Sequence, residues 1–515
     1  MVSLSCGSKP IDPRTVVPGD ALVYLETRDL GAALRSITES DAFARISKKK
    51  PDLSAISSVK MSVAVTGFET SEKAESPDGS ILNFQPRFVA VIETNAWSWQ
   101  TTSFIEDKLG EFINDVYGGG VELVVTRKDG GEFYVWTSQD GRKAFALQQG
   151  SLVLFGNDET AIEKCQAVRR GEAESIAKNP KVTDGDRIAF GYVSPDGLAQ
   201  LANIEGVSIA MEAGEDAEVK SFIARVLPEI LRTSVTDLAW SASRSASGIE
   251  DSYDIGLNPQ VAQVFAPALT SGNAKGWDTA SFVPYEAASV TRYDLADARI
   301  AWQSLLNTLQ TRTDAVNGKL ISAFSVGLFE PYAIENADLF LVSIRGPLTT
   351  VKLDIDSDDV AVIALSTDIP ALKKSVAKEI SFAKASEKIG DAEVWRSADG
   401  NAAVAVIGYV VILGDAAIVR KCLASGQGGK NFTGNSASAA LGSSSAAIAS
   451  FTGDAETPPK LSAVLGEPSE TKGAQPIIAE TRFDQTGMQR KVTSDFGLVG
   501  TLIAQFAAEA VQSPQ

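Results

Sequence analysis

The chain has 515 residues and a formal net charge of −18, from 47 Lys+Arg and 65 Asp+Glu. Apolar residues make up 44% and charged residues 22%, a globular composition that excludes a disordered or collagen-like chain. The sequence contains no histidine and three cysteines. These counts exclude a Ser-His-Asp triad, a His-ligated metal site, a Cys₄ zinc site and an iron–sulfur cluster. We therefore assign no catalytic residue, no metal ligand and no cofactor.

Charge and hydropathy limit the partners that the chain can have. Neither half of the sequence is basic, so neither carries the electrostatic footprint of a nucleic-acid-binding protein. The longest apolar stretch, residues 496–511, is interrupted by Gln505 and Glu509 and is too short to span a bilayer. We expect no nucleic-acid partner and no transmembrane helix, and we interpret this stretch as a final helix.

The N-terminal segment contains a candidate lipidation site. The run that ends in Ser5-Cys6-Gly7 is similar to the cleavage box of bacterial lipoproteins, in which the cysteine becomes the lipid-bearing first residue. Only five residues precede Cys6, fewer than a signal peptide needs, so lipidation requires a start upstream of Met1. The alternative is a free cysteine in a flexible terminus. We assign residues 1–17 as the lipidation site and a stiff tether.

Predicted elements in the first half combine hairpin-linked strands with helices. Residues 21–25 form a strand, and Asp29 is placed to cap the helix that follows. A turn at residues 76–79 joins two strands. The remaining elements that we expect in this unit, which spans residues 18–269, are a helix at 104–116, three or four strands between 121 and 155, a helix carrying Cys165, a strand at 187–193, a helical span at 198–232, and strands at 237–248 and 251–257.

The same motifs occur twice in the same order. The hexad Trp-x-Ser-x-Asp-Gly appears in both halves, and each copy is followed by two apolar runs and a helix that ends in Lys-Cys. Matched positions in the two halves are Trp136 with Trp395, Cys165 with Cys422, and Asp254 with Asp495. Collinear matches of this kind predict a tandem duplication, with a linker at residues 270–282 and a second repeat at residues 283–515.

We expect an α+β fold with a mainly antiparallel sheet in each repeat, because helices come between groups of hairpin-linked strands. In the second repeat, Asp294 is predicted to cap a helix whose apolar face carries Ala298, Trp302 and Leu305. Residues 424–445 are rich in Gly, Ser and Asn, and residues 453–476 are rich in Pro and Glu. These compositions predict two long loops.

An acidic run at residues 354–359 reads Asp-Ile-Asp-Ser-Asp-Asp and resembles the start of a calcium loop. An EF-hand loop needs Gly at its sixth position and Glu at its twelfth, where this chain has Asp359 and Leu365. We therefore expect a solvated turn that binds cations weakly.

Tryptophans and cysteines are the remaining candidates for a site. Trp136 and Trp395 recur in both halves next to a tight turn, which indicates a packing role in the core. Trp97 and Trp99 have no counterpart in the second half, and in an extended strand they would share one face. We take Trp97 and Trp99 as a candidate contact surface. The two matched cysteines are expected to be buried apolar residues.

Three short segments carry a resemblance to a known family. They are Val-Pro-x-x-Ala-x-x-Tyr-x-x-x-x-Asp-Leu at residues 17–30, Ser-Asp-Ala-Phe-Ala-Arg-Ile at residues 40–46, and Leu-Phe-Gly-Asn-Asp-Glu-x-Ala at residues 154–161. Together they resemble a family of uncharacterised bacterial exported lipoproteins known only as a domain of unknown function. The resemblance implies an envelope location and no known catalysis.

These observations favour a non-catalytic cell-envelope lipoprotein that acts as a scaffold, binding module or accessory subunit of a larger assembly. It would be periplasmic or attached to the outer membrane by lipid on Cys6, with other envelope or membrane proteins as partners. One alternative is a carboxylate-based, glycosidase-like hydrolase outside the cytoplasm, which needs two carboxyl groups about 5–10 Å apart. The other is a periplasmic small-molecule binding protein, which needs a cleft.

Overall fold

The computed structural model describes residues 10–76, 79–211, 217–272, 276–383, 385–469 and 475–507. Helices and antiparallel strands alternate over these residues, which confirms the predicted α+β class. The strands of the first half are β1 (Val23–Thr27), β2 (Lys60–Ser76), β3 (Gly79–Glu93), β4 (Glu122–Lys128), β5 (Gly131–Thr137), β6 (Lys143–Gln149), β7 (Leu152–Gly156), β8 (Ala189–Val193), β9 (Val235–Ser245) and β10 (Gly248–Leu257). Those of the second half are β11 (Ser289–Tyr293), β12 (Ile344–Lys352), β13 (Ala361–Ser366), β14 (Glu387–Ile389), β15 (Ala392–Arg396), β16 (Ala402–Ile407), β17 (Val410–Asp415), β18 (Ile448–Asp454), β19 (Gln475–Phe483) and β20 (Gly487–Ser494).

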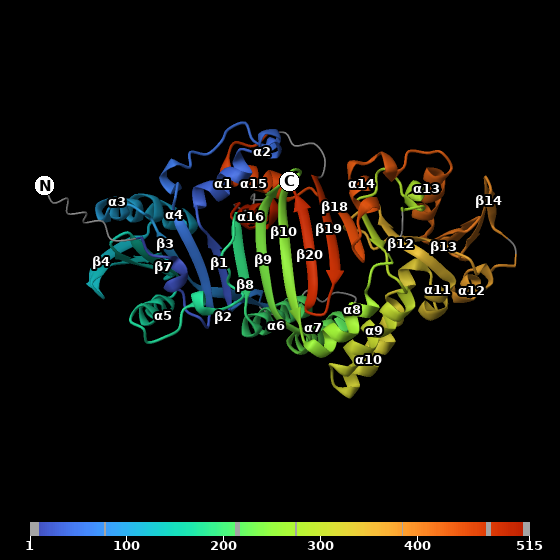
Figure 1. Ribbon diagram of the computed structural model, residues 1–515, viewed down its shortest axis with the longest axis horizontal. Helices are drawn as coiled ribbons and strands as arrows, with labels where there is room; N and C mark the ends of the chain where they lie inside the picture. The colour runs from blue at the N-terminus through green and yellow to red at the C-terminus, as the bar shows by residue number, and fades with distance from the viewer. Residues whose placement is uncertain are drawn as a thin grey trace.

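Counted over the described residues, the strands join into one 20-stranded sheet in which neighbours are antiparallel. The pairings give the order β4-β5-β6-β7-β3-β2-β1-β8-β9-β10-β20-β19-β18-β11-β12-β13-β17-β16-β15-β14. The sheet runs along the long axis of the molecule, with its edge strands β4 and β14 near opposite ends (Figure 1).

Strand pairing is identical in the two halves when it is read outward from the central pair, β10 and β20. A tandem duplication would produce this symmetry, and the duplication itself stays a prediction. Trp136 and Trp395 lie on the corresponding strands β5 and β15. The predicted match of Asp254 with Asp495 is wrong, because Asp254 lies within β10 whereas Asp495 follows the end of β20. Counted from the glycine that opens each strand, Gly248 or Gly487, Asp254 is the seventh residue of β10, whereas the seventh residue of β20 is Thr493.

Helices cover both faces of the sheet. In the first half, α5 (Glu159–Arg169) covers one face, and the other face is covered by α3 (Ser98–Ser103), the π-helical turn η3 (Phe104–Leu109) and α4 (Gly110–Val116). In the second half, α13 (Ala416–Gly426) and α14 (Ser436–Ser443) cover one face, opposite α9 (Ala298–Thr311), α11 (Ala337–Ser343) and α12 (Ile369–Ser375). Trp136 and Trp395 are each 3% exposed, which confirms their predicted place in the core.

Each half also completes the core of the other. The second-half helices α15 (Thr457–Leu465) and α16 (Gly497–Ala504) pack with α1 (Leu30–Thr38) and α2 (Asp41–Ile46), so that Leu461 and Phe496 share one cluster with Ile37 and Phe43. Conversely, α7 (Ala217–Ser234) and α8 (Pro259–Ala268) of the first half pack with α9 and α10 (Ala315–Gly327). Each half therefore depends on the other for its apolar contacts.

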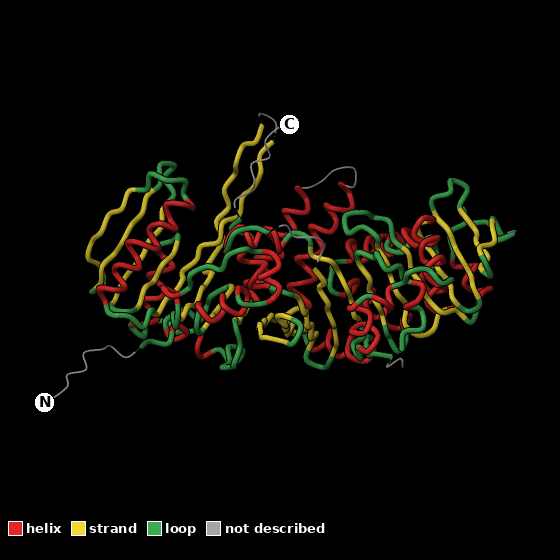
Figure 2. The backbone as a smooth tube through the Cα atoms, turned by 90° about the horizontal axis from the view of Figure 1, so that it is seen from above, coloured by secondary structure: helices red, strands yellow, loops and turns green. Residues whose placement is uncertain are grey.

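A long hairpin breaks the symmetry. Strand β2 pairs with β1 only over Met61–Val65, and β3 pairs with β7 only from Val89 to Glu93, while β2 and β3 pair with each other far beyond these limits. The two long strands stand out from the sheet in Figure 2. Residues 77 and 78 of the predicted turn lie outside the described residues, and the strands on either side of it pair with each other as far as Ser76 and Gly79.

The two long loops predicted in the second half are wrong. Residues 424–445 contain the 3-10 turn η7 (Phe432–Gly434) and α14, and residues 453–476 contain α15. Phe432, Leu441 and Leu461 are fully buried, and their burial holds these Gly- and Pro-rich segments on the body. The helical span predicted at residues 198–232 is confirmed by α6 (Pro195–Met211) and α7.

Helix capping was predicted correctly in one half only. The carboxylate of Asp29 accepts a hydrogen bond from the Ala32 backbone N–H at 2.8 Å, as predicted. In the second half, the cap is Asp297, which accepts from Ile300 N–H. Asp294 is instead buried and pairs with the fully buried guanidinium of Arg292 at 3.0 Å. A buried arginine without an ionic partner would destabilise this core. Asp294, which is nearer to Arg292 in the chain than Asp297 is, forms the ion pair.

Two segments predicted to be free connections are packed. Val16 and Val17 are buried in the core of the first half, so residues 10–17 are not a tether, while Cys6 lies outside the described residues. Within the predicted linker, Trp277 is buried and donates a hydrogen bond to the Thr349 hydroxyl at 2.9 Å. The final helix forms as α16, and no helix in the described ranges is long and apolar enough to cross a membrane.

Candidate functional site

Trp97 and Trp99 lie where the chain leaves the sheet and enters α3. Trp97 is the residue before the helix, and its backbone N–H donates to the Gln100 side chain at 3.0 Å, while Trp99 lies in the first turn. The prediction that both share one face of an extended strand is therefore wrong. The two residues are nevertheless 60% and 70% exposed, so the structure leaves both available for contact.

A buried carboxylate ties the N-terminal segment to the same corner of the molecule. Glu93, at the end of β3, is fully buried. One of its carboxylate oxygens accepts the backbone N–H of Ile11 at 3.1 Å, and the other accepts the backbone N–H of Asn95 at 3.0 Å. Because Asn95 comes two residues before Trp97, the point at which the N-terminal segment joins the body is fixed next to the exposed tryptophans.

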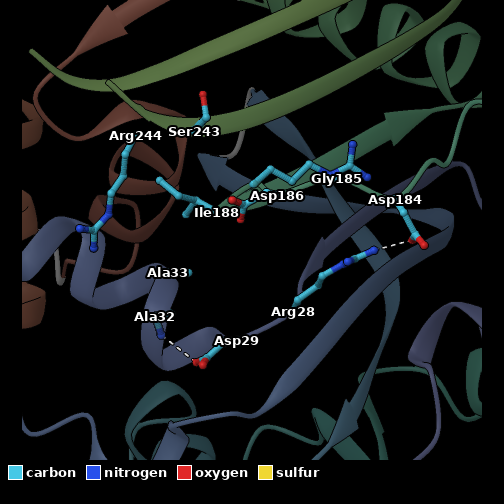
Figure 3. A pocket seen from close by; sticks show the side chains of 11 residues that line it. Arg28, Asp29, Ala32, Ala33, Asp184, Gly185, Asp186, Ile188, Ser243 and Arg244 are labelled. Carbon is cyan, nitrogen blue, oxygen red and sulfur yellow. Dashed lines mark hydrogen bonds and ion pairs between the residues drawn. The ribbon is translucent and has the colours of Figure 1, made fainter. Parts of the chain in front are cut away.

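A polar pocket of about 840 Å³ lies on the first half, between α1, the segment before β8, and β9 (Figure 3). Its charged lining residues come from three segments and are balanced: Arg28, Arg187, Arg244, Asp29, Asp184 and Asp186. Arg28 and Asp184 pair with each other at one side, and Arg244 extends from β9 at the other (Figure 3). Arg244 also lines a neighbouring pocket of about 460 Å³.

Two of the three carboxylates of this polar pocket, those of Asp184 and Asp29, have partners within the protein. Arg14, and then Arg28, hold the pKa of Asp184 below its usual range through ion pairs and hydrogen bonds. The carboxylate of Asp29 is used as the cap of α1. A glycosidase needs one carboxyl group that holds its proton near neutral pH. The ionised state of Asp184 is the opposite of what that role requires.

Behind the polar pocket lies a buried hydrogen-bonded group. Arg187 donates to the Glu26 carboxylate at 3.1 Å and stacks over the ring of Phe190. The other oxygen of Glu26 accepts from the Tyr24 hydroxyl at 2.8 Å. Burial, and then the charge of Glu26, raise the pKa of Tyr24. The phenol therefore stays neutral, and the network holds β1 against the segment before β8.

An apolar cavity of about 320 Å³ lies in the second half, between the sheet and the helices α9 and α11. Trp302 on α9 packs edge-to-face on Phe329, with ring centroids 5.0 Å apart, and this pair forms one wall. The lining is aliphatic and aromatic apart from Thr350 and two tyrosine hydroxyls: Leu269, Tyr293, Leu295, Ala298, Ala301, Trp302, Leu305, Leu328, Phe329, Tyr332, Ile334, Phe340, Leu341, Leu348, Thr350, Val362 and Ile448. No charged residue contributes to this lining.

The polar groups of the apolar cavity remain neutral. Burial raises the pKa of Tyr293, and burial together with the neighbouring Tyr293 raises the pKa of Tyr332 to about 12. Both phenols can donate or accept a hydrogen bond without bringing charge into the cavity. The cavity therefore suits a ligand that is apolar over most of its surface and carries one uncharged polar group.

The remaining candidates from the sequence are structural. Cys165 and Cys422 are free and fully buried, as predicted, and burial raises the pKa of each thiol to about 12. The acidic run at residues 354–359 forms an exposed connection between β12 and β13. Among the described residues, no group of three or more Cys, Asp or Glu side chains is arranged to hold a metal ion.

Neither pocket was recognised from the sequence. The apolar face of α9, with Ala298, Trp302 and Leu305, was predicted as a core face, but its periodicity does not reveal that space remains beneath it. The arginines of the polar pocket lie far apart in the chain, so no local motif marks them. Of the described residues that the sequence proposed for a site, Trp97 and Trp99 are the pair whose exposure supports a role in contacts.

Comparison with family models, with curated proteins and with solved structures finds no match to this chain.

Proposed function

We propose that this protein is a non-catalytic binding module of the bacterial cell envelope that holds an apolar small molecule, such as an acyl chain or an isoprenoid, in the apolar cavity of its second half. The observation that carries this proposal is the uncharged lining of that cavity. Each Å² of apolar ligand surface moved from water into such a site contributes about 25 cal/mol. No acid, base or nucleophile is needed for that role.

The frame around the apolar cavity supports a preformed site. Its floor is made by central strands of the second half, including β11, β12 and β13, and its walls by α9 and α11. Val351, Ile363 and Val290 pack the opposite face of these strands and leave the floor little freedom to move. A ligand that enters a preformed site loses less binding energy to ordering of the protein.

The sequence supports attachment to the envelope through lipid on Cys6. Ser5-Cys6-Gly7 supplies the lipoprotein-like segment, and residues 10–17, which follow it in the sequence, pack on the body. A diacylglyceryl group would hold the protein stably, because two acyl chains bind a membrane where one binds only marginally. We propose the membrane and the apolar ligand as its partners, and a periplasmic or outer-membrane-attached location.

Filling the apolar cavity tests the proposal. Ala298 lines the cavity and is the first residue of α9, after the cap Asp297, so Ala298→Trp should occupy the ligand space. Ala315 is the exposed first residue of α10, after the cap Asp314, and Ala315→Trp is the matched control. We expect N-phenyl-1-naphthylamine to fluoresce with the wild type and with Ala315→Trp, to be displaced by fatty acids, and to lose at least tenfold in affinity with Ala298→Trp. Equal probe binding by all three proteins would refute the assignment of the cavity.

A further inference from the structure

We infer that Trp97 and Trp99 face the bilayer and place their indole rings in its interface when the protein is anchored. This inference rests on the proposed lipid at Cys6 and adds the surface that meets the membrane. It follows from the point at which the N-terminal segment joins the body, from the reach of that segment, and from the character of the surface around the two tryptophans.

The joining point is fixed by hydrogen bonds. The fully buried carboxylate of Glu93 accepts the Ile11 N–H at 3.1 Å and the Asn95 N–H at 3.0 Å. A buried carboxylate that lost these donors would be left with no partner to replace its lost hydration, so the arrangement is rigid. Ile11 and the segment that leads to Trp97 are thus held on the same carboxylate.

The reach of the intervening chain is short. Four residues lie between Cys6 and Ile11, which makes five steps along the chain, and a fully extended chain covers at most about 3.3–3.6 Å per step, or about 17 Å in total. Lipid on Cys6 would therefore bring the membrane surface to within about 17 Å of Ile11. Trp97 comes only four residues after Glu93, so the corner that carries Trp97 and Trp99 is the part of the body that the tether holds near the headgroups. The tether sets no such limit on the edge strand β14 near the far end of the molecule (Figure 1).

The segment that carries the two tryptophans suits a membrane interface. Residues 94–105 contain no charged side chain, although charged residues make up 22% of the chain. Most of the acidic body would be repelled by anionic headgroups, so an uncharged segment is the part that can approach. Tryptophan is enriched at membrane interfaces, because its ring is apolar and its N–H can bond to headgroups or water.

Both exposed indoles lie within this uncharged segment. At 60% and 70% exposure, they are among the most exposed large apolar side chains of the described residues. Phe104 and Ile105, later in the same segment, are packed inward instead and hold the helix on the sheet. Phe104 and Ile105 therefore fix the segment on the body, while Trp97 and Trp99 remain free to contact a membrane.

Quenching by brominated lipid tests this inference on the full chain isolated from the membranes of its native cells. The protein is reconstituted into vesicles of zwitterionic phosphatidylcholine that is brominated near the headgroup end of the acyl chains. We expect the tryptophan fluorescence of the wild type to be quenched, and the variant Trp97→Phe/Trp99→Phe to lose most of that quenching. Vesicle attachment should survive in the variant, since the lipid remains.

A relocated indole provides the matched control. Tyr409, in the turn between β16 and β17 of the second half, is 67% exposed, so Tyr409→Trp in the double variant restores an exposed indole far from Ile11. We expect this triple variant to remain unquenched. Equal quenching of wild type and double variant, with lipid present on Cys6, would overturn the inference and leave the anchor standing. Absence of lipid on Cys6 would overturn the anchor, and this inference with it.

Discussion

Gly248 and Gly487 occupy reciprocal positions at the centre of the molecule. A Cβ atom on Gly248 would lie 2.4 Å from the carbonyl oxygen of Ser494, and a Cβ atom on Gly487 would lie 2.0 Å from that of Ile255. Gly248 opens β10 and Gly487 opens β20, and these two strands join the halves into one sheet. Each half thus supplies a glycine that lets the backbone of the other approach.

Alanine at either glycine should destabilise the protein to a similar extent. Both residues have positive φ, of 134° and 157°, in addition to the close carbonyl, so we expect Gly248→Ala and Gly487→Ala each to cost about 2 kcal/mol or more. Chemical denaturation measures this loss. Gly327→Ala is the control, because a Cβ there meets nothing within 4 Å at the end of α10 and should be neutral or stabilising. Losses at the two central glycines no larger than the control would contradict the packed junction.

We expect the chain to unfold in one step, because helices of each half pack into the core of the other half. Leu461 on α15 is fully buried against Ile37 and Phe43 of the first half, so Leu461→Ala should cost about 2–5 kcal/mol and lower the transition of the whole chain. Leu502→Ala on α16, where the side chain is exposed, is the control. Calorimetry should show one shifted peak. A separate early peak for one half would show that the halves fold independently.

These junctions explain which parts of the fold the sequence could predict. Local signals were sufficient for the α+β class, for the Asp29 cap and for the burial of Trp136 and Trp395. No local signal announces that β10 pairs with β20, because the paired residues lie more than two hundred positions apart. Composition gave the wrong prediction of a loop at residues 424–445. There the burial of Phe432 and Leu441 stabilises ordered structure despite the Gly, Ser and Asn residues around them.

Loss of either partner of the buried ion pair between Arg292 and Asp294 should lower the free energy of unfolding strongly. The Arg292 guanidinium also donates to the backbone carbonyls of Leu441 at 3.1 Å and Ser444 at 2.9 Å, so it ties β11 to the end of α14. Asp294→Ala leaves a buried arginine without its carboxylate and should cost about 3–5 kcal/mol. The double variant Arg292→Met/Asp294→Ala should recover part of that loss in urea unfolding. A double variant that is less stable than Asp294→Ala would show that the arginine stabilises without its partner.

Stability should fall at alkaline pH through the buried tyrosines. The pKa of Tyr332 is raised from 10.0 to about 12 by burial and by Tyr293. In the window between these two values, the folded state keeps a proton that the unfolded state loses, so raising the pH favours unfolding. We expect urea midpoints to decline from pH 10 upward and to decline less in Tyr332→Phe. The same slope in both proteins would assign the loss to other groups.

The candidate site was less predictable than the fold, for a physical reason. A cavity is a difference between the volume that a frame encloses and the volume that its side chains fill, and sequence periodicity reports only the side of a helix that faces inward. Trp302 and Leu305 were correctly placed on that side, yet nothing local indicated the space beside them. Trp97 and Trp99 could be recognised from the sequence, because two tryptophans without a counterpart in the second half are a local feature.

Intact mass spectrometry of the protein from its native membranes tests the central claim most directly, because it reports the covalent and the bound lipid together. Under denaturing conditions, we expect a chain that begins at Cys6 and carries a diacylglyceryl group. Under native conditions, we expect an additional apolar molecule that Ala298→Trp removes and Ala315→Trp retains. A chain with an unmodified Cys6 thiol and no bound apolar molecule would contradict both the membrane anchor and the binding function.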